Sequence, residues 1–357
     1  MLVIPVNNLG DNSKTHKVIS FIYILFLIWV YAKLRTFLLG ICIRKTIYSI
    51  DIFVKEARIL QFTQFKIIEA AKEGRRKVHP VFAVILAIVF LTLGELFMLF
   101  ILFLPEAKTG LMKAIYSDIE MILTFGGAIF FVFLWIRFVE KRSISSIGFW
   151  RNEWIRKYLR GALLGFVFIS IPVLLLLLTG NVQLQMQQIT PTAILGITGS
   201  LVAFLIQGAT EEIVVRGWLF PVLSVKSRIW IGIVVTSFLF GFLHLLNPGI
   251  TILSISNIIL VGVFAVFYVL KDSSLWGICA WHSIWNWAQY NVFGFAVSGM
   301  TMYSTPLFKP VTNGSEFLHG GSFGIEGSII TTIMLSIASI VLWRQLWGRK
   351  VKQRDLN

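Results

Sequence analysis

Two adjacent carboxylates, Glu211 and Glu212, lie near the end of a long apolar stretch and are followed by Arg216. Charged side chains are costly inside apolar membrane helices, so such residues are the first candidates for chemistry. Residues four apart share one face of a helix, which predicts an ion pair between Glu212 and Arg216. Glu211 is then rotated by about 100° from that pair and is free to face another helix. The alternative is a helix end whose acidic pair is solvated.

Two further apolar stretches carry imidazole and carboxamide groups. His244 follows Phe240 by one helical turn, and His282 precedes Asn286 by the same spacing in a Trp-rich run. A single His on an apolar helix is more often a hydrogen-bonded core residue than a catalyst. Buried imidazole and carboxamide groups are costly unless they are hydrogen-bonded, and the three stretches can satisfy one another. The sequence therefore predicts one polar site shared by three helices.

The composition indicates which elements position these groups. Hydrophobic residues make up 57% of the chain and charged residues 14%, whereas soluble proteins carry roughly 25% charged residues. The two cysteines, Cys42 and Cys279, lie in apolar runs, which excludes a disulfide-stabilised secreted scaffold and predicts free thiols. We expect an integral membrane protein of the all-α class, a polytopic transmembrane helical bundle with eight or nine spans and an amphipathic helix near its N-terminus.

A bilayer core requires about 20 apolar residues per helix. Runs of this kind predict nine spans, at about residues 18–42, 81–104, 117–138, 161–179, 192–210, 229–246, 250–270, 275–297 and 326–346. With the N-terminus outside the cell, 27 of the 32 Lys and Arg residues fall on one face of this arrangement. Positively charged loops stay on the cytoplasmic side, so the basic C-terminal tail is expected in the cytoplasm of a multi-pass cell-membrane protein.

Two segments between these spans have a different character. Residues 46–78 are too charged to cross a membrane and predict an amphipathic helix, which either lies on the anionic cytoplasmic leaflet or packs on the spans. Residues 298–325 are rich in Gly, Ser and Thr and predict an outer loop. Glu95 lies in the middle of the second span, where it is either functional or a protonated acid bonded to a neighbouring helix.

In order and spacing, the three polar clusters resemble the motifs of the CPBP family of membrane proteins. That family includes the eukaryotic prenyl-protein (CAAX) endoproteases and bacterial proteins linked to bacteriocin processing and self-immunity. Its motifs Glu-Glu-x-x-x-Arg, Phe-x-x-x-His and His-x-x-x-Asn are filled by Glu211, Glu212, Arg216, Phe240, His244, His282 and Asn286. The resemblance covers residues 145–290, and a Gly-rich stretch at 320–327 is similar to bacterial members. Residues 1–140 are not covered.

The resemblance implies hydrolysis of a peptide bond in a membrane-associated protein or peptide. Glu211 and His244 would activate a water molecule, and His282 and Asn286 would stabilise the oxyanion. The remaining motif residues, Glu212, Arg216 and Phe240, would support these four. The roles suit the groups, because carboxylate and imidazole accept protons and N–H donors stabilise an oxyanion.

Two His and one Glu also match the ligands of many catalytic zinc sites, and the family has often been called a metalloprotease family for that reason. Bound zinc would take Glu211, His244 and His282 as ligands. However, the chain has no His-Glu-x-x-His motif, and Asn286 is a poor zinc ligand but a good oxyanion donor. We therefore favour a metal-independent, glutamate-type reaction without a cofactor.

Two alternatives involve no hydrolysis. A proton-coupled transporter would use Glu211, His244 and His282 as a relay and would show symmetry between its halves, whereas the sequence has no internal repeat. An immunity or scaffold protein would keep the fold and bind a partner peptide. We expect an N-terminal membrane region (1–140), a protease core (141–297) and a final loop, span and tail (298–357). The expected partners are a membrane-associated peptide or protein and the anionic cytoplasmic leaflet, with no nucleic acid.

Overall fold

A computed structural model describes residues 65–104 and 108–354. The α-helices in this part of the chain are α3 (Lys66–Lys72), α4 (Pro80–Glu95), α5 (Gly110–Leu134), α6 (Trp154–Leu178), α7 (Pro191–Glu212), α8 (Phe220–Lys226), α9 (Ile229–Phe242), α10 (Ile252–Asp272), α11 (Trp276–Trp287), α12 (Glu316–His319) and α13 (Ile329–Arg354). Short 3₁₀ segments are η3 (Leu96–Phe103), η5 (Ile144–Ile147), η8 (Gly321–Phe323) and η9 (Ile325–Gly327). Three π-helical segments, η4 (Trp135–Val139), η6 (Ile213–Leu219) and η7 (Ala288–Val292), extend longer helices. The predicted all-α class is confirmed for these residues, apart from two short strands.

Six helical runs are long and apolar enough to cross a membrane among the residues described. They are Pro80–Ile101, Gly110–Val139, Trp154–Leu178, Pro191–Lys226, Ile252–Asp272 and Ile329–Leu346. Each overlaps one of the nine predicted spans, and together they indicate a multi-pass membrane protein. Two other predicted spans correspond to shorter helices, α9 with 14 residues and α11 with 12. The first predicted span, 18–42, lies outside the described residues.

Several element boundaries differ from the prediction. The third span was expected from residue 117, but α5 begins at Gly110, where the Thr109 hydroxyl caps the helix by accepting a hydrogen bond from the Met112 N–H (3.2 Å). The eighth was expected to reach residue 297, but its helical run ends at Val292. Two residues later, Gly294 adopts a φ of +73°, which favours glycine and does not continue a helix. A hydrophobic run alone does not mark such caps and turns.

The stretch expected to be only an outer loop contains a strand. Strand β2 (Phe308–Thr312) pairs antiparallel with β1 (Val182–Met186), which connects α6 and α7. The register runs from Val182 opposite Thr312 to Met186 opposite Phe308. Both strands are five residues long and lie more than 120 residues apart in sequence, so no local turn signal announces their pairing.

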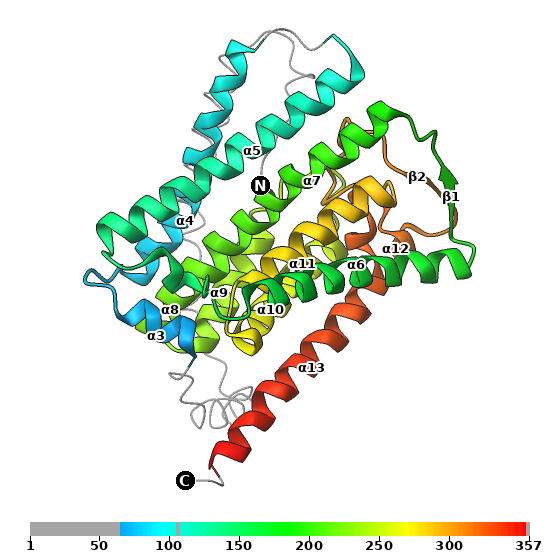
Figure 1. Ribbon diagram of the computed structural model, residues 1–357. Coiled ribbons are helices and arrows are strands. Elements are labelled where there is room, and N and C mark those ends of the chain that lie inside the picture. The colour runs from blue at the N-terminus through cyan, green and yellow to red at the C-terminus, as the bar shows by residue number, and fades with distance from the viewer. Residues whose placement is uncertain (1–64, 105–107, 355–357) are drawn as a thin grey trace. The chain divides into compact units, whose positions relative to one another are not determined.

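Helix α11 packs against both α6 and α7, which lie beside it in Figure 1. Small residues permit this close approach: an added Cβ at Gly161 or Gly165 of α6 would collide with the α11 backbone. On the other side, an added Cβ at Gly208 of α7 would lie 2.6 Å from the backbone nitrogen of Ser283. Glycine therefore sets α7 and α11 at a short distance where α7 carries Glu211 and α11 carries His282.

The described part of the predicted amphipathic segment is the short helix α3. Its apolar side chains Ile67 and Ile68 are buried, and the helix contacts α8. For residues 66–72, this favours the alternative in which the helix packs on the protein. Residues 46–64 lie outside the described part, so the long amphipathic helix remains a prediction.

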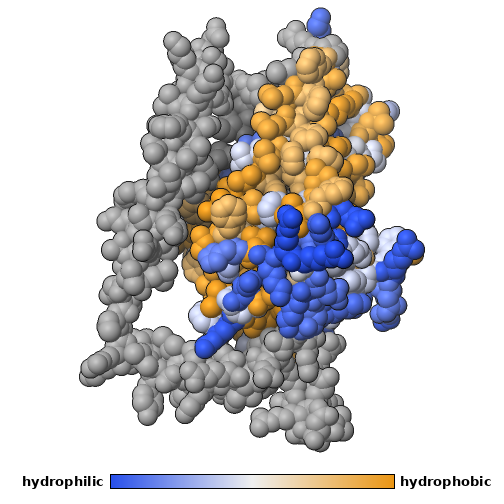
Figure 2. Space-filling model, turned by 90° about the vertical axis from the view of Figure 1, so that its left-hand side faces the viewer, coloured by the Kyte–Doolittle hydropathy of each residue, from blue (hydrophilic) through white to orange (hydrophobic). Residues whose placement is uncertain are grey.

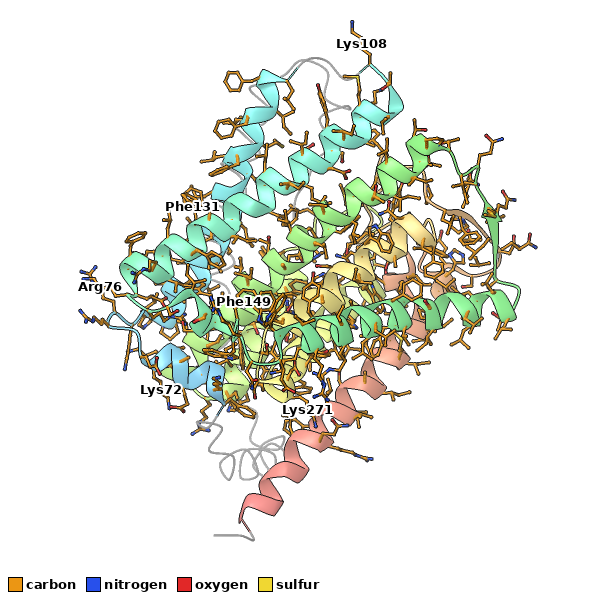
Figure 3. All side chains as sticks on the ribbon, viewed as in Figure 1. Lys72, Arg76, Lys108, Phe131, Phe149 and Lys271 are labelled. Atoms are coloured by element: carbon orange, nitrogen blue, oxygen red, sulfur yellow. The ribbon has the colours of Figure 1, made fainter. Side chains whose placement is uncertain are left out.

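Cationic residues lie at opposite ends of the molecule, and a broad part of its surface is apolar. Lys108 lies at the end opposite Lys72 and Arg76 (Figure 3). Figure 2 shows a broad apolar surface bordered by a hydrophilic region. Among the helices with exposed apolar side chains is α4, which exposes Val81, Phe82, Ile85 and Val89. A helix surface of this kind suits lipid contact. Glu95 ends α4 and is half-buried.

Candidate active site

The carboxylate and guanidinium predicted to pair do so in the structure. Arg216 Nη1 donates to Glu212 Oε1 at 3.0 Å, and neither side chain is exposed. Arg216 lies in the π-helical segment η6 that continues α7, and its guanidinium carbon lies 4.2 Å from the centre of the Phe240 ring. Arg216 therefore links the first motif to the second through a cation–π contact.

Glu211 points away from that ion pair, as the helical spacing predicts. Its Oε1 accepts a hydrogen bond from Gln207 Nε2 at 2.8 Å, and its Oε2 lies 3.6 Å from His282 Nε2. The second distance is longer than a normal hydrogen bond. One carboxylate oxygen is thus held in place, and the other faces an imidazole without a tight bond to it.

His282 lies between the two adjacent carboxylates. Its Nδ1 donates to Glu212 Oε1 at 2.8 Å, while its Nε2 faces Glu211. Glu212 therefore orients this ring in addition to pairing with Arg216, a second partner that helical spacing does not predict because it comes from α11. The opposite nitrogen of the ring is directed into the site by this bond.

His244 does not lie within a helix, contrary to the predicted span to residue 246. Helix α9 ends at Phe242, and His244 lies in the following turn. Its Nδ1 bonds to the Phe240 carbonyl oxygen at 2.7 Å, one of the carbonyls left without a partner at a helix C-terminus. A carbonyl only accepts, so Nδ1 carries the proton and Nε2 has a lone pair. Among the residues that the structure describes, Nε2 has no hydrogen-bond partner.

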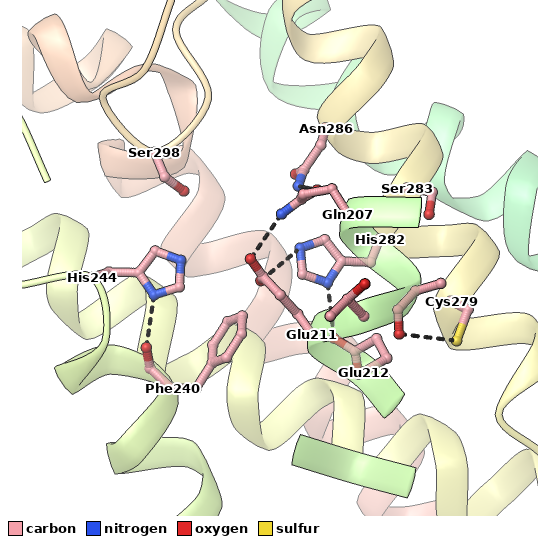
Figure 4. Close-up of polar contacts among 12 residues, drawn as sticks. Gln207, Glu211, Glu212, Phe240, His244, Cys279, His282, Ser283, Asn286 and Ser298 are labelled. Atoms are coloured by element: carbon pink, nitrogen blue, oxygen red, sulfur yellow. Dashed lines mark hydrogen bonds and ion pairs between the residues drawn. The ribbon is translucent and has the colours of Figure 1, made fainter. Parts of the chain in front are cut away.

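The Phe240 ring lies close to the imidazoles of both His244 and His282. Its ring centre lies 4.9 Å from that of His244 and 6.1 Å from that of His282. Figure 4 shows the two imidazoles on either side of the Glu211 carboxylate, with Phe240 below them. The three clusters therefore meet in one place, as their need for partners predicts.

Asn286 is connected to the site through a residue that the sequence analysis did not single out. Its Nδ2 donates at 2.9 Å to Oε1 of Gln207, which is itself bonded to Glu211 (Figure 4). Gln207 is one helical turn before Glu211 in an otherwise apolar run. That spacing was the available signal, because it places both side chains on one face of α7.

Two other predictions concern the cysteines and a zinc ion. Cys279 is buried as a free thiol, while Cys42 lies outside the described residues. Within 65–104 and 108–354, no three His, Cys, Asp or Glu side chains are grouped so that they could hold a metal ion. The residues named for zinc, Glu211, His244 and His282, therefore do not fit a ligand set in this arrangement.

Replacing Arg216 with Ala is expected to destabilise the fold. The change would leave Glu212 buried without its cation, and breaking a buried pair in this way costs about 3–5 kcal/mol. Thermal unfolding of the purified protein in detergent measures the effect. Arg156→Ala is the matched control, because its pair with Glu153 is solvent-exposed and such pairs contribute little. An unchanged melting midpoint for Arg216→Ala would refute its structural role.

Comparison with known proteins agrees with the motifs. Residues 193–288 match the family model described as type II CAAX prenyl endopeptidase Rce1-like. This range contains all seven motif residues. No curated protein and no solved structure matches the chain.

Proposed function

From the match of residues 193–288, which supports the CPBP and CAAX protease family, we propose that this protein is an intramembrane endopeptidase. The observation that carries the proposal is the Glu211 carboxylate, which lies on a helical run of membrane length, is held by Gln207 and faces the His282 imidazole. A carboxylate, two imidazoles and a carboxamide supply the groups that peptide hydrolysis requires.

In the proposed reaction, a water molecule binds between Glu211 and His244. The Nε2 lone pair of His244 and the Glu211 carboxylate accept hydrogen bonds from this water and take up one proton as it attacks the scissile carbonyl carbon. The carbonyl π bond breaks and leaves negative charge on the oxygen. His282 carries a proton on both nitrogens, so its Nε2–H stabilises that oxyanion together with the Asn286 N–H group, while its Nδ1–H stays on Glu212. When the C–N bond breaks, the stored proton passes to the leaving nitrogen.

Glu212, Arg216 and Phe240 support this reaction without contacting the substrate. Glu212 fixes the orientation of His282, because it accepts from Nδ1 and leaves Nε2 facing the site. Arg216 compensates the buried charge of Glu212. The Phe240 ring packs against both imidazoles and gives one side of the site an apolar surface.

Cleavage by purified protein tests the proposal. The protein is reconstituted in liposomes with synthetic membrane-associated peptides, with and without a prenylated C-terminal cysteine, and the products are identified by mass spectrometry. We expect a new pair of termini at one peptide bond. Binding of a peptide without cleavage would instead favour an immunity or scaffold protein, and proton uptake coupled to solute transport would favour a transporter.

We propose that the reaction needs no metal. Asn286 is a poor zinc ligand but a good oxyanion donor, which supports this proposal. Activity is expected to persist after exhaustive chelation, with far less than one metal ion per chain. Metal analysis of the active preparation is the measurement that decides. Activity that returns only when zinc is added would overturn this mechanism and leave the peptidase proposal intact.

The proposed orientation places the site toward the cytoplasm. The basic segments lie in the cytoplasm, the N-terminus lies outside and the C-terminal tail lies inside, in accordance with the distribution of Lys and Arg. In this arrangement residues 141–297 form the protease core.

A further inference from the structure

Gln207 has no part in the reaction as proposed above, although it contacts two of the four groups that carry it out. It is buried, donates to Glu211 Oε1 at 2.8 Å and accepts from Asn286 Nδ2 at 2.9 Å. Its carboxamide lies between Glu211 of its own helix and Asn286 of α11 (Figure 4). It is thus a bridge between the proposed base and the proposed oxyanion donor.

The polarity of this bridge follows from the carboxylate at one end. An ionised carboxylate only accepts hydrogen bonds, so Gln207 must turn its Nε2 toward Glu211. Its Oε1 then faces Asn286, and an amide oxygen also only accepts. Asn286 must therefore present its Nδ2 on this side and turn its Oδ1 away. That oxygen is buried and has no hydrogen-bond partner among the described residues.

This arrangement has a consequence for the oxyanion. An amide nitrogen carries two hydrogens, and Gln207 uses one of those on Asn286 Nδ2. The other remains on the same nitrogen, next to the Gln207 carboxamide, and is available to the oxyanion. If the Asn286 carboxamide were reversed, its oxygen would face the developing negative charge and repel it.

We propose that Gln207 is a positioning residue, which holds the Asn286 amide with its N–H side toward the site. This inference rests on the proposed function. It assigns Gln207 a role in the transition state, because the orientation of Asn286 matters most when charge develops on the substrate oxygen. A residue that only packs between α7 and α11 would have no such role.

The contrast between kcat and KM tests this role. Gln207→Met keeps the size of the side chain and removes both hydrogen bonds, and we expect kcat to fall about tenfold or more while KM changes less than twofold. Gln207→Glu keeps an acceptor for Asn286 but places a second carboxylate against Glu211, so its kcat should also fall. Ser283→Ala is the matched control, because Ser283 joins α11 to α7 by a bond to the Leu205 carbonyl oxygen and contacts no catalytic group. Its kcat should be unchanged.

A double-mutant cycle shows whether Gln207 acts through Asn286. In the Asn286→Ala background, Gln207→Met should reduce kcat by a clearly smaller factor than in the wild type. Equal factors in the two backgrounds, or a normal kcat for Gln207→Met, would overturn the inference.

Melting midpoints of the same two single variants and the double variant test this inference separately from the proposed function. Non-additive shifts in the midpoint are expected for two side chains in contact, and additive shifts would refute the bridge. If the wild type hydrolyses no peptide but the shifts are non-additive, the peptidase proposal fails and the ordering of Asn286 stands.

Discussion

Replacing Glu211 with Gln is expected to lower the rate of peptide hydrolysis by about 10²–10⁴-fold, the usual contribution of a general acid–base group. The substituted amide has nearly the same shape, and its oxygen can still accept from Gln207 Nε2, so the fold should be retained. What is lost is the ability to take a proton from water. The measurement is kcat with the same reconstituted peptide substrate, alongside the melting midpoint in detergent.

Glu95→Gln provides a matched control for this prediction. Glu95 is also a carboxylate in a membrane-length helix, but it ends α4 and contributes nothing to the bonds around Glu211. Its replacement should leave kcat unchanged, which would support a structural role for this acid. A Glu211→Gln variant with normal activity would show that another group is the base, and His244 would be the first residue to examine.

The parts of the site that the sequence predicts are those governed by helical spacing. The Glu212–Arg216 pair and the separate direction of Glu211 both follow from the rotation of about 100° per residue in one helix. The meeting of the three clusters follows from a different argument, the cost of leaving buried polar groups without partners.

The contacts between helices were not predictable in the same way. The bond from His282 to Glu212 depends on how α11 is rotated and how closely it approaches its neighbours, which Gly161 and Gly165 permit toward α6 and Gly208 permits toward α7. The position of His244 beyond the end of α9 depends on where the helix stops. Apolar runs locate helices well, but they do not mark helix ends or axial rotation.

The fold, too, has parts that the sequence predicts and parts that it does not. Six long apolar runs became membrane-length helices, because each can bury or expose apolar surface over its whole length. The β1–β2 pair was missed because its strands are short and are separated by a large part of the chain. The contact between Gln207 and Glu211 was missed although the sequence indicates it. The two residues have the same spacing as Glu212 and Arg216, whose pairing was predicted.

Replacing Asn286 with Ala is expected to reduce kcat by about 10²–10³-fold, as loss of a single oxyanion donor does in other hydrolases. KM should change little, because the carboxamide stabilises charge that is absent from the bound substrate. Asn286→Asp sharpens the test: it keeps the shape of the side chain, removes the N–H donors and places an acceptor where the oxyanion forms. We therefore expect its kcat to be at least as low as that of the Ala variant.

Asn257→Ala distinguishes this catalytic effect from loss of stability. Asn257 is a buried carboxamide on α10 that donates to the backbone carbonyl oxygens of Glu326 and Ser328 and has no hydrogen bond to the four proposed catalytic groups. Its replacement should lower the melting midpoint and leave the kcat of the folded fraction near normal, whereas Asn286→Ala should lower the kcat of the folded fraction whatever its effect on the midpoint. Equal losses of kcat in the two variants would mean that Asn286 supports the fold alone. A proportionate rise in KM for Asn286→Ala would instead mean that it binds the substrate and the transition state equally well, and the oxyanion would then depend on His282.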